Sequence, residues 1–460
     1  MGFQSQFIKW KNKLYDFGRT VNERSKNNKL KRATLNSLPF WIASVAAGLL
    51  AVFYSEIFHL AETLLNDIDL RHNPWVFVFT PLAFVISWFL IYRFSKSASG
   101  SGIPQLMVAI DFANQKKHKN IINRLLSVRV IIVKILSSTV LLFGGGAIGR
   151  EGPTIQVAGS VFNSINNIIP SYWPKISHKL MLISGGAAGL AAAFNTPLGG
   201  IVFAIEELGK SYLNSIRNHL FVAIIIAGIT SKLLLGSYLY LGSADVPEMK
   251  FMGFFYVLLT AAAAGGFGYL FSKIIISFVR LKQKFNSFLK NLIWVLVVGF
   301  LFALLVYNAG NQAVGSGKGI ISNLLFDHRF IMDWFAFPAR FLGTILSYIS
   351  GAAGGVFAPS LAIGATIGES IVMILNIEEF KNLIIVVGMI AFMAGVTHSP
   401  FTSFILVLEM TNAQNSIFPM MMASIIGYAI SRGFSKRSLY ENLSANYMKQ
   451  AEKWENKPVK

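Results

Sequence analysis

The chain has 460 residues, of which 54% are apolar and only 13% are charged, with a formal net charge of +20. A soluble globular domain carries about 25% charged residues, so this composition excludes an ordinary water-soluble protein. The absence of cysteine excludes disulfide bonds and metal sites with thiolate ligands.

Basic residues gather near both ends of the chain, in KWKNK, RSKNNK and LKR within residues 1–32 and in RGFSKR and further lysines near the C-terminus. Basic segments beside membrane spans mark the cytoplasmic side, so we expect both termini in the cytoplasm and no nucleic acid as a partner. Such a surface is also expected to contact anionic membrane lipid. The first 32 residues lack the apolar core and cleavage site of a signal peptide. Residues 1–36 are expected to form a basic cytoplasmic helix whose apolar face holds Phe3, Phe7, Trp10, Leu14 and Phe17.

Long apolar runs recur along the chain, at 38–54, 75–92, 219–241 and 292–307. Each approaches or exceeds the roughly 20 residues that cross a bilayer as a helix, and none alternates as the strands of a membrane barrel do. The sequence therefore predicts an all-α polytopic membrane protein with a transmembrane transport domain at 37–445. Residues 446–460 are expected to be a short cytoplasmic tail, without a large soluble regulatory domain.

The transmembrane domain contains an internal repeat. LISGGAAGLAAAFNTPLGGIVFAIEE and IVVGMIAFMAGVTHSPFTSFILVLEM align on Pro197 and Pro400. GAIGREGPTIQVAG and AAGGVFAPSLAIGA align on Pro153 and Pro359, and upstream GSGIPQ aligns with GSGKGI. The alignment leaves open whether the halves run parallel or inverted, although inverted repeats are common in transporters with a site at the membrane midplane. The halves run over these residues: about 38–240 and about 250–440.

Three glycine-rich stretches each precede a helical apolar pattern: GSGIP at 100–104, GREGP at 149–153 and GGVFAP at 354–359. Proline is favoured at the first helical position, and the glycines let the backbone turn and expose its N–H groups. A helix N-terminus has a positive partial charge and free donors, so three such starts inside a membrane would form an anion site from backbone alone. The alternative is that the glycines permit close helix packing and the prolines only kink the helices.

These stretches, in this order and with Tyr440 of SLYENL in the closing segment, resemble the CLC family of chloride channels and proton/chloride antiporters over about residues 38–445. The resemblance implies a homodimer with one anion pathway per subunit, in which each subunit has two inverted repeats of tilted and broken helices. It implies chloride and protons as partners, no cofactor and no enzymatic activity. The lack of cysteine and of an appended regulatory domain suggests a prokaryotic inner membrane.

The resemblance also implies an anion site. Ser101 and Tyr440 would offer their hydroxyls to the ion, and the backbone N–H groups of Val356 and Phe357 would complete its shell. Such donors suit a chloride ion because a full ammonium charge would hold it too tightly to leave. The remaining motif residues would support the site: Gly100, Gly102, Ile103, Pro104, Gly149, Arg150, Gly152, Pro153, Gly355, Ala358 and Pro359.

Two glutamates are expected to move the proton. Glu151 of GREGP would be the gating glutamate on the outer side, and Glu207 of FAIEE the inner proton-transfer residue. An ionised carboxylate can occupy the anion site in place of chloride. Once the carboxylate is protonated, it becomes neutral and leaves the site free. Burial favours the neutral form of a carboxyl, whereas helix N-termini and hydrogen bonds favour the ionised form, so a carboxyl at this position could switch near neutral pH.

The repeat bears on whether transport is coupled. Glu206 aligns with Glu409, so this shared acid is expected to cap or pair structurally. Glu207 aligns with Met410, so the unshared acid is expected to have its own task. In the family, antiporters usually have an acid at this position and channels an apolar residue. The sequence thus favours coupled antiport over a passive channel, and the structural alternative is that Glu207 ends its helix at the cytoplasmic surface.

In the family, serine in GSGIP is associated with a preference for chloride, and proline at the same position is associated with a preference for nitrate. Fluoride exporters depart from the motif. Ser101 therefore implies chloride, with exchange of nitrate or fluoride as the alternative. Gln105, where many relatives have Glu, is expected to have a minor effect on the surface potential. Arg150 is expected to bond nearby carbonyls. Lys134, a lone cation in an apolar run, is expected to have a structural role, with tuning of the electrostatic potential at the site as the alternative.

An intramembrane enzyme is a remote alternative. A serine-type protease would need a serine and a histidine facing each other within spans, but the histidines are scattered and mostly have polar or turn-like neighbours. An aspartyl type would need paired aspartates, which here cluster in loops such as NDIDL and FDHRF. His398 aligns with Asn195 in the repeat, which indicates hydrogen bonding at a helix end.

Overall fold

The computed structural model describes residues 29–113, 118–170, 173–209, 218–236, 240–246, 251–327 and 329–455. Most of the helix expected at 1–36 lies outside these ranges, and its last residues belong to the first described helix. The described part of the chain is almost entirely helical, and its β-type pairing consists of two isolated bridges.

The first half of the chain forms α2 (Lys29–Asn66), α3 (Val76–Phe94), α4 (Ile103–Phe112), α5 (Lys119–Leu125), α6 (Val128–Phe143), α7 (Glu151–Ile168), α8 (His178–Phe194), α9 (Pro197–Phe203) and α10 (Asn218–Leu235). The second half forms α11 (Phe251–Lys282), α12 (Phe288–Ala309), α13 (Lys318–Phe326), α14 (Ala336–Ile349), α15 (Phe357–Leu375), α16 (Lys381–Thr397), α17 (Pro400–Thr411) and α18 (Ile417–Phe434). The last helix is α19 (Leu439–Glu455). Residues 446–455, expected in the tail, continue this helix, where Trp454 stacks under the Arg124 guanidinium of α5 at 4.2 Å.

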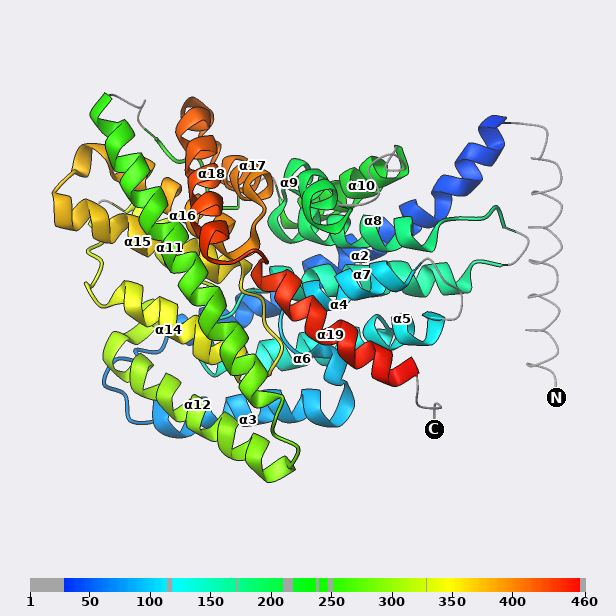
Figure 1. Cartoon of the computed structure of the whole chain (residues 1–460), viewed down its shortest axis with the longest axis horizontal. Coiled ribbons are helices and arrows are strands. Elements are labelled where there is room, and N and C mark those ends of the chain that lie inside the picture. The colour runs from blue at the N-terminus through cyan, green and yellow to red at the C-terminus, as the bar shows by residue number, and fades with distance from the viewer. Residues whose placement is uncertain are drawn as a thin grey trace.

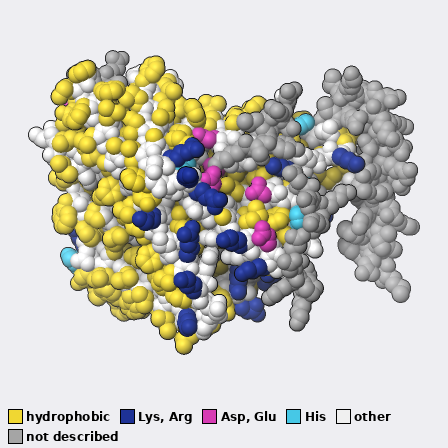
Figure 2. Space-filling model, in the orientation of Figure 1, with side chains coloured by type: hydrophobic (Ala, Val, Ile, Leu, Met, Phe, Trp, Pro, Cys, Tyr) yellow, Lys and Arg dark blue, Asp and Glu magenta, His cyan; other side chains and the backbone are white. Residues whose placement is uncertain are grey.

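Nine helices in the described ranges are long and apolar enough to cross a membrane. Their burial differs: the apolar window of Glu378–Thr397 is 89% buried, whereas that of Phe288–Ala313 is only 39% buried. A helix that is apolar on all sides belongs in a core or in lipid, so α16 forms the centre and α12 presents a face to the membrane. In Figure 1 the second half lies mainly to the left, with α19 crossing in front. Hydrophobic side chains cover the left part of the same view in Figure 2.

Equivalent helices of the two halves pack alike. α7 packs on α8 as α15 packs on α16, and α2 packs on α10 as α11 packs on α18. Asn195 after α8 and His398 after α16 both have left-handed backbones, with φ of 55° and 57°, and a proline begins the next helix in each half. The N–H of His398 donates to the carbonyl of Ala394 at 2.9 Å, which is the helix-end role that the repeat predicts.

The contacts between α9 and α17 are reciprocal. The Glu409 carboxylate at the end of α17 accepts a hydrogen bond from the N–H of Gly199 in α9 at 2.9 Å. In return, the Glu206 carboxylate that follows α9 accepts from the N–H of Thr402 in α17 at 2.7 Å. Contacts that are exchanged in this way indicate a two-fold axis between the partners. The two halves are therefore related by an approximate two-fold axis, and the shared acid caps a helix, as predicted.

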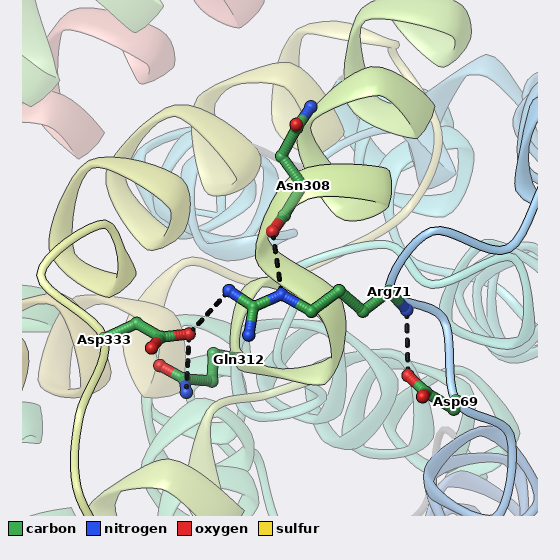
Figure 3. Close-up of polar contacts among 5 residues, drawn as sticks. All are labelled: Asp69, Arg71, Asn308, Gln312 and Asp333. Carbon is green, nitrogen blue, oxygen red and sulfur yellow. Dashed lines mark hydrogen bonds and ion pairs between the residues drawn. The ribbon is translucent and has the colours of Figure 1, made fainter.

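A polar cluster joins the loop after α2 to the second half of the chain (Figure 3). Arg71, in the loop after α2, donates through Nε to the carbonyl of Asn308 at 3.1 Å and through Nη2 to Asp333 Oδ2 at 2.8 Å. Asp69 Oδ1 accepts from the N–H of Arg71 at 3.0 Å, and Gln312 donates to Asp333 at 3.4 Å. Exposed ion pairs contribute about 0–1 kcal/mol each, so this cluster fixes the path of the loops more than it stabilises the fold.

Candidate functional site

The three predicted helix starts meet. A Cβ added to Gly152 would lie 3.0 Å from Ser101 Cβ and 3.4 Å from Gly355 Cα, which brings the starts of α7, α4 and α15 into contact. Gly102, the residue before α4, has φ of 96°, a left-handed conformation that side-chain-bearing residues rarely adopt. The glycines are therefore required both for the turn into α4 and for the close approach of the three backbones.

Backbone hydrogen bonds hold these starts together. Gly149 and Gly355 exchange two of them, with N–O distances of 2.8 and 2.7 Å. Gly100 donates to the carbonyl of Ala352 at 2.8 Å and accepts from Gly354 at 3.2 Å. Neither α7 nor α15 has a side-chain cap at its N-terminus. Because the first N–H groups of a helix have no intrahelical acceptor, this junction presents backbone donors to a bound anion or carboxylate.

Glu151, the first residue of α7, is completely buried. The hydroxyl of Tyr240 donates to its Oε1 at 3.2 Å. Its Oε2 lies directly over Gly149, and a Cβ on that glycine would also meet Pro359 Cδ at 3.0 Å. The carboxylate is therefore folded back over the helix starts of α7 and α15 and does not point into solvent. It occupies the position that a bound anion would take.

A cavity of about 180 Å³, hereafter the Glu62 cavity, borders this carboxylate. Arg150, Glu62, Tyr240 and Lys318 are among its lining residues. The Arg150 guanidinium makes no hydrogen bond or ion pair in the described part of the chain, so the expectation that it bonds carbonyls is wrong. It is partly exposed and lends its charge to this cavity.

Tyr440, at the start of α19, approaches the junction from the other side. Its ring stacks on that of Phe357, with centroids 5.8 Å apart and planes at 22°. Its hydroxyl is buried and has no hydrogen-bond partner in the described ranges. An unpartnered buried hydroxyl is unfavourable unless a ligand completes its bonding, as the predicted anion contact would.

Ser101 is buried at the start of α4, where its Oγ lies 3.4 Å from the N–H of Ile103. The hydroxyl of Tyr348 lies next to Gly100, 3.0 Å from the position of a Cβ added to that glycine, a neighbour that the motifs did not predict. Tyr348 also lines a cavity of about 420 Å³ together with Gly100 and Lys282. The junction is therefore bordered by one cavity beside Glu151 and by another beside Gly100.

Glu207 is 3% exposed and lies in a π-helical turn at Ala204–Leu208. Such turns occur often at functional sites. Its Oε2 accepts a hydrogen bond from the Oγ of Ser399, the residue before α17, at 2.7 Å. The alternative that Glu207 merely ends its helix at the surface is therefore wrong.

Two buried cations bond to backbone carbonyls in equivalent positions of the repeat. Lys134 Nζ donates to the carbonyl of Gly100 at 2.8 Å, and Arg340 Nη1 donates to that of Gly315 at 3.1 Å. The structural role predicted for Lys134 is confirmed, and Arg340 fills the same role in the other half. Gln105 is buried and donates to the carbonyl of Ser99 at 2.6 Å, so it positions the start of α4 and does not act at the surface.

Comparisons with known proteins agree with this geometry. The family described as "Voltage gated chloride channel" matches residues 82–432. The "H(+)/Cl(-) exchange transporter ClcA" of Vibrio cholerae serotype O1 is 31% identical over 426 residues, covering 87% of this chain and 87% of that protein. The protein of the same name from Vibrio parahaemolyticus is 31% identical over 434 residues, covering 88% of this chain and 90% of that one.

Solved structures share the fold. A "slow cyanobacterial Cl-/H+ antiporter" matches with a TM-score of 0.74 at 21% identity, covering 90% of this chain and 98% of that one. A "CLC-type fluoride/proton antiporter" matches with a TM-score of 0.73 at 19% identity, covering 91% of this chain and 99% of that one. The predicted fold class, an all-α membrane protein of inverted repeats and broken helices, is confirmed.

Proposed function

Because this chain belongs to the voltage-gated chloride channel family, we propose that it exchanges chloride for protons across a membrane, with Glu151 as the gating carboxylate. The observation that carries this proposal is the burial of two carboxylates, Glu151 and Glu207, in a protein whose buried Tyr440 hydroxyl has no hydrogen-bond partner in the described ranges. A passive pore for chloride needs the hydroxyl but has no use for the second buried acid.

The anion binds at the junction of the helix starts. Ser101 and Tyr440 contribute hydroxyls, and Val356 and Phe357 contribute backbone N–H groups from the uncapped start of α15. These donors are dipoles, so they attract chloride without the full charge that would trap it. The ionised Glu151 carboxylate competes for the same donors, and protonation removes that competition.

The proton crosses the protein by way of the two carboxyl groups. Glu151 borders the Glu62 cavity and takes a proton from that side. Glu207 is held by Ser399 and exchanges its proton with the opposite side. Each time Glu151 leaves the helix starts as a neutral acid, chloride takes its place, which couples the two movements.

The wild-type chain in liposomes tests the exchange directly. A chloride gradient across vesicles with a weakly buffered outer solution is expected to drive protons in the opposite direction, against their own gradient, as recorded with a pH electrode. Chloride flux without proton movement would identify a passive channel. Proton movement driven by nitrate or fluoride, but not by chloride, would identify an exchanger for that anion.

Ser101→Pro is expected to raise the ratio of nitrate to chloride flux by about tenfold. Proline removes one hydrogen bond to the ion, and such a bond to a charged group contributes about 1.5 kcal/mol; the compact chloride ion depends on it more than nitrate does. Ser160→Ala, which removes a buried hydroxyl bonded within α7, is the matched control. An unchanged ratio in Ser101→Pro would mean that Ser101 does not contact the ion.

The chain is a multi-pass membrane protein, and we place it in a prokaryotic inner membrane with both termini in the cytoplasm. Figure 2 shows Lys and Arg side chains gathered over the middle of one face, where α19 crosses in Figure 1. Basic segments mark the cytoplasmic side, which supports this orientation, and their charge favours anionic lipid. A homodimer with one pathway per subunit is part of the proposal.

A further inference from the structure

Tyr240 is the one side chain in the described ranges that donates a hydrogen bond to the Glu151 carboxylate, through its hydroxyl at 3.2 Å from Oε1. The other carboxylate oxygen is buried and accepts none in this part of the chain. Tyr240 itself is 4% exposed and lines the Glu62 cavity beside Glu151. The phenol therefore fixes the orientation of the carboxylate from the side of that cavity.

Contacts on several sides hold the Tyr240 ring. Phe194, at the end of α8, meets it edge to face with centroids 5.1 Å apart. Lys318 Nζ, at the start of α13, lies 4.8 Å from the ring centroid. The N–H groups of Leu241 and Ala244 donate to carbonyls at the C-terminal end of α17, at 3.3 and 2.9 Å. The hydroxyl thus reaches Glu151 from a ring that three helices position.

The ring also belongs to a row of aromatics that passes the anion site. Phe194 contacts Phe357 with centroids 6.4 Å apart, and Phe357 stacks on Tyr440 at 5.8 Å. The row has a tyrosine at each end, Tyr240 and Tyr440. The Tyr440 hydroxyl has no hydrogen-bond partner in the described ranges, whereas the Tyr240 hydroxyl is bonded to Glu151. The two tyrosines therefore differ in role: the Tyr440 hydroxyl is available to an anion, and the Tyr240 hydroxyl binds the gating carboxylate.

We propose that Tyr240 is a positioning residue that latches the ionised Glu151 carboxylate over the helix starts; this inference rests on the proposed function of Glu151 as the gate. A hydrogen bond to an ionised acceptor is about twice as strong as one between neutral groups. The latch is therefore strong while Glu151 is charged, and weak once a proton neutralises it. Tyr240 thereby favours the closed, ionised state.

Other charged or titratable groups also face Glu151 from the elements around it: Arg150, Tyr54, Glu56, His59, Glu62, Lys318 and Tyr440. Tyr240→Phe leaves all of them in place and keeps the aromatic contacts of the ring. Only the hydroxyl is lost, so a change in the pH profile of this variant reports on the latch.

Tyr240→Phe is expected to move the pH at which chloride flux is half-maximal upward by about one unit, a tenfold change in proton affinity. Flux requires the neutral gate, and without the latch Glu151 is protonated at higher pH. Chloride flux in liposomes is recorded across a pH series for four proteins: the parent, Tyr240→Phe, Glu151→Gln and the double variant. Tyr307→Phe, a partly buried tyrosine of α12, is the matched control.

An unchanged or downward-shifted profile in Tyr240→Phe would overturn the latch. If Glu151→Gln flattens the profile at the same time, the gate itself stands. A Tyr240→Phe effect that persists in the Glu151→Gln background would also overturn the latch, because the phenol would then act elsewhere. A parent-like profile in Glu151→Gln would instead overturn the proposed function.

Discussion

Glu151→Gln is expected to give chloride flux that no longer responds to pH and no longer moves protons. Glutamine has the shape of glutamate, but it neither titrates nor competes with chloride as an anion. In the parent, the neutral fraction of a single carboxyl falls by about tenfold per pH unit above its midpoint, and flux should follow that fraction. The measurement is the initial rate of chloride efflux from liposomes at several pH values, with proton uptake recorded in parallel.

Glu56→Gln is the matched control, because Glu56 lines the same cavity but is exposed. It removes one negative charge near the gate without touching the helix starts, and it should retain both pH dependence and proton coupling. Proton movement that persists in Glu151→Gln would remove Glu151 from the mechanism. Loss of both properties in Glu56→Gln as well would assign them to the charge of the cavity and not to one carboxyl.

The helix starts could be predicted from the sequence because their chemistry is local. Glycines followed by a proline specify a turn and an uncapped helix start within five or six residues, as at GSGIP and GREGP. The repeat added the tertiary relation: two stretches that align in sequence, such as those around Gly149 and Gly355, also lie against each other on the two-fold axis. Glu206 and Glu409 were predicted as structural for the same reason.

Contacts between distant and unpatterned residues could not be predicted. Tyr240 lies 89 residues from Glu151, in a segment that belongs to no motif. The hydroxyl of Tyr348 approaches Gly100 from the end of α14, where an apolar helix pattern gives no sign of it. Arg340 did leave a signal, since the alignment of Pro153 with Pro359 also pairs it with Lys134.

The error at Arg150 has a geometric cause. Adjacent residues on a helix do not face each other, so Glu151 can fold over the helix starts while Arg150 points toward the Glu62 cavity. The adjacency of an acid and a base in GREGP carried no information on which of them bonds the backbone. The carbonyl-bonding role belongs to cations placed one helix earlier in each half, Lys134 and Arg340.

Glu207→Ala is expected to abolish proton movement while chloride flux stays within about twofold of the parent, less than 0.5 kcal/mol in the barrier. Glu207 accepts a hydrogen bond from Ser399 and lies in the turn after α9, outside the starts of α4, α7 and α15 that form the proposed anion site, so its loss is expected to leave the anion route intact. Without the inner carboxyl, a proton on Glu151 has no acceptor on the other side. The measurement is the ratio of proton to chloride flux under a chloride gradient in liposomes.

Glu206 provides a sharp control because it is the adjacent residue with the opposite assignment. Its carboxylate accepts from the N–H groups of Phe401 and Thr402 at the start of α17. Glu206→Ala should therefore destabilise the detergent-solubilised protein by about 1–2 kcal/mol, the usual loss on removing a helix cap, while the folded fraction retains coupling. Proton coupling that survives Glu207→Ala, or is lost only with Glu206, would mean that the proton leaves by another route. If the two effects separate as expected, Glu206 stabilises the fold and its neighbour Glu207 transfers the proton. The repeat already indicates this distinction, because Glu206 has an acidic counterpart in the other half and Glu207 has none.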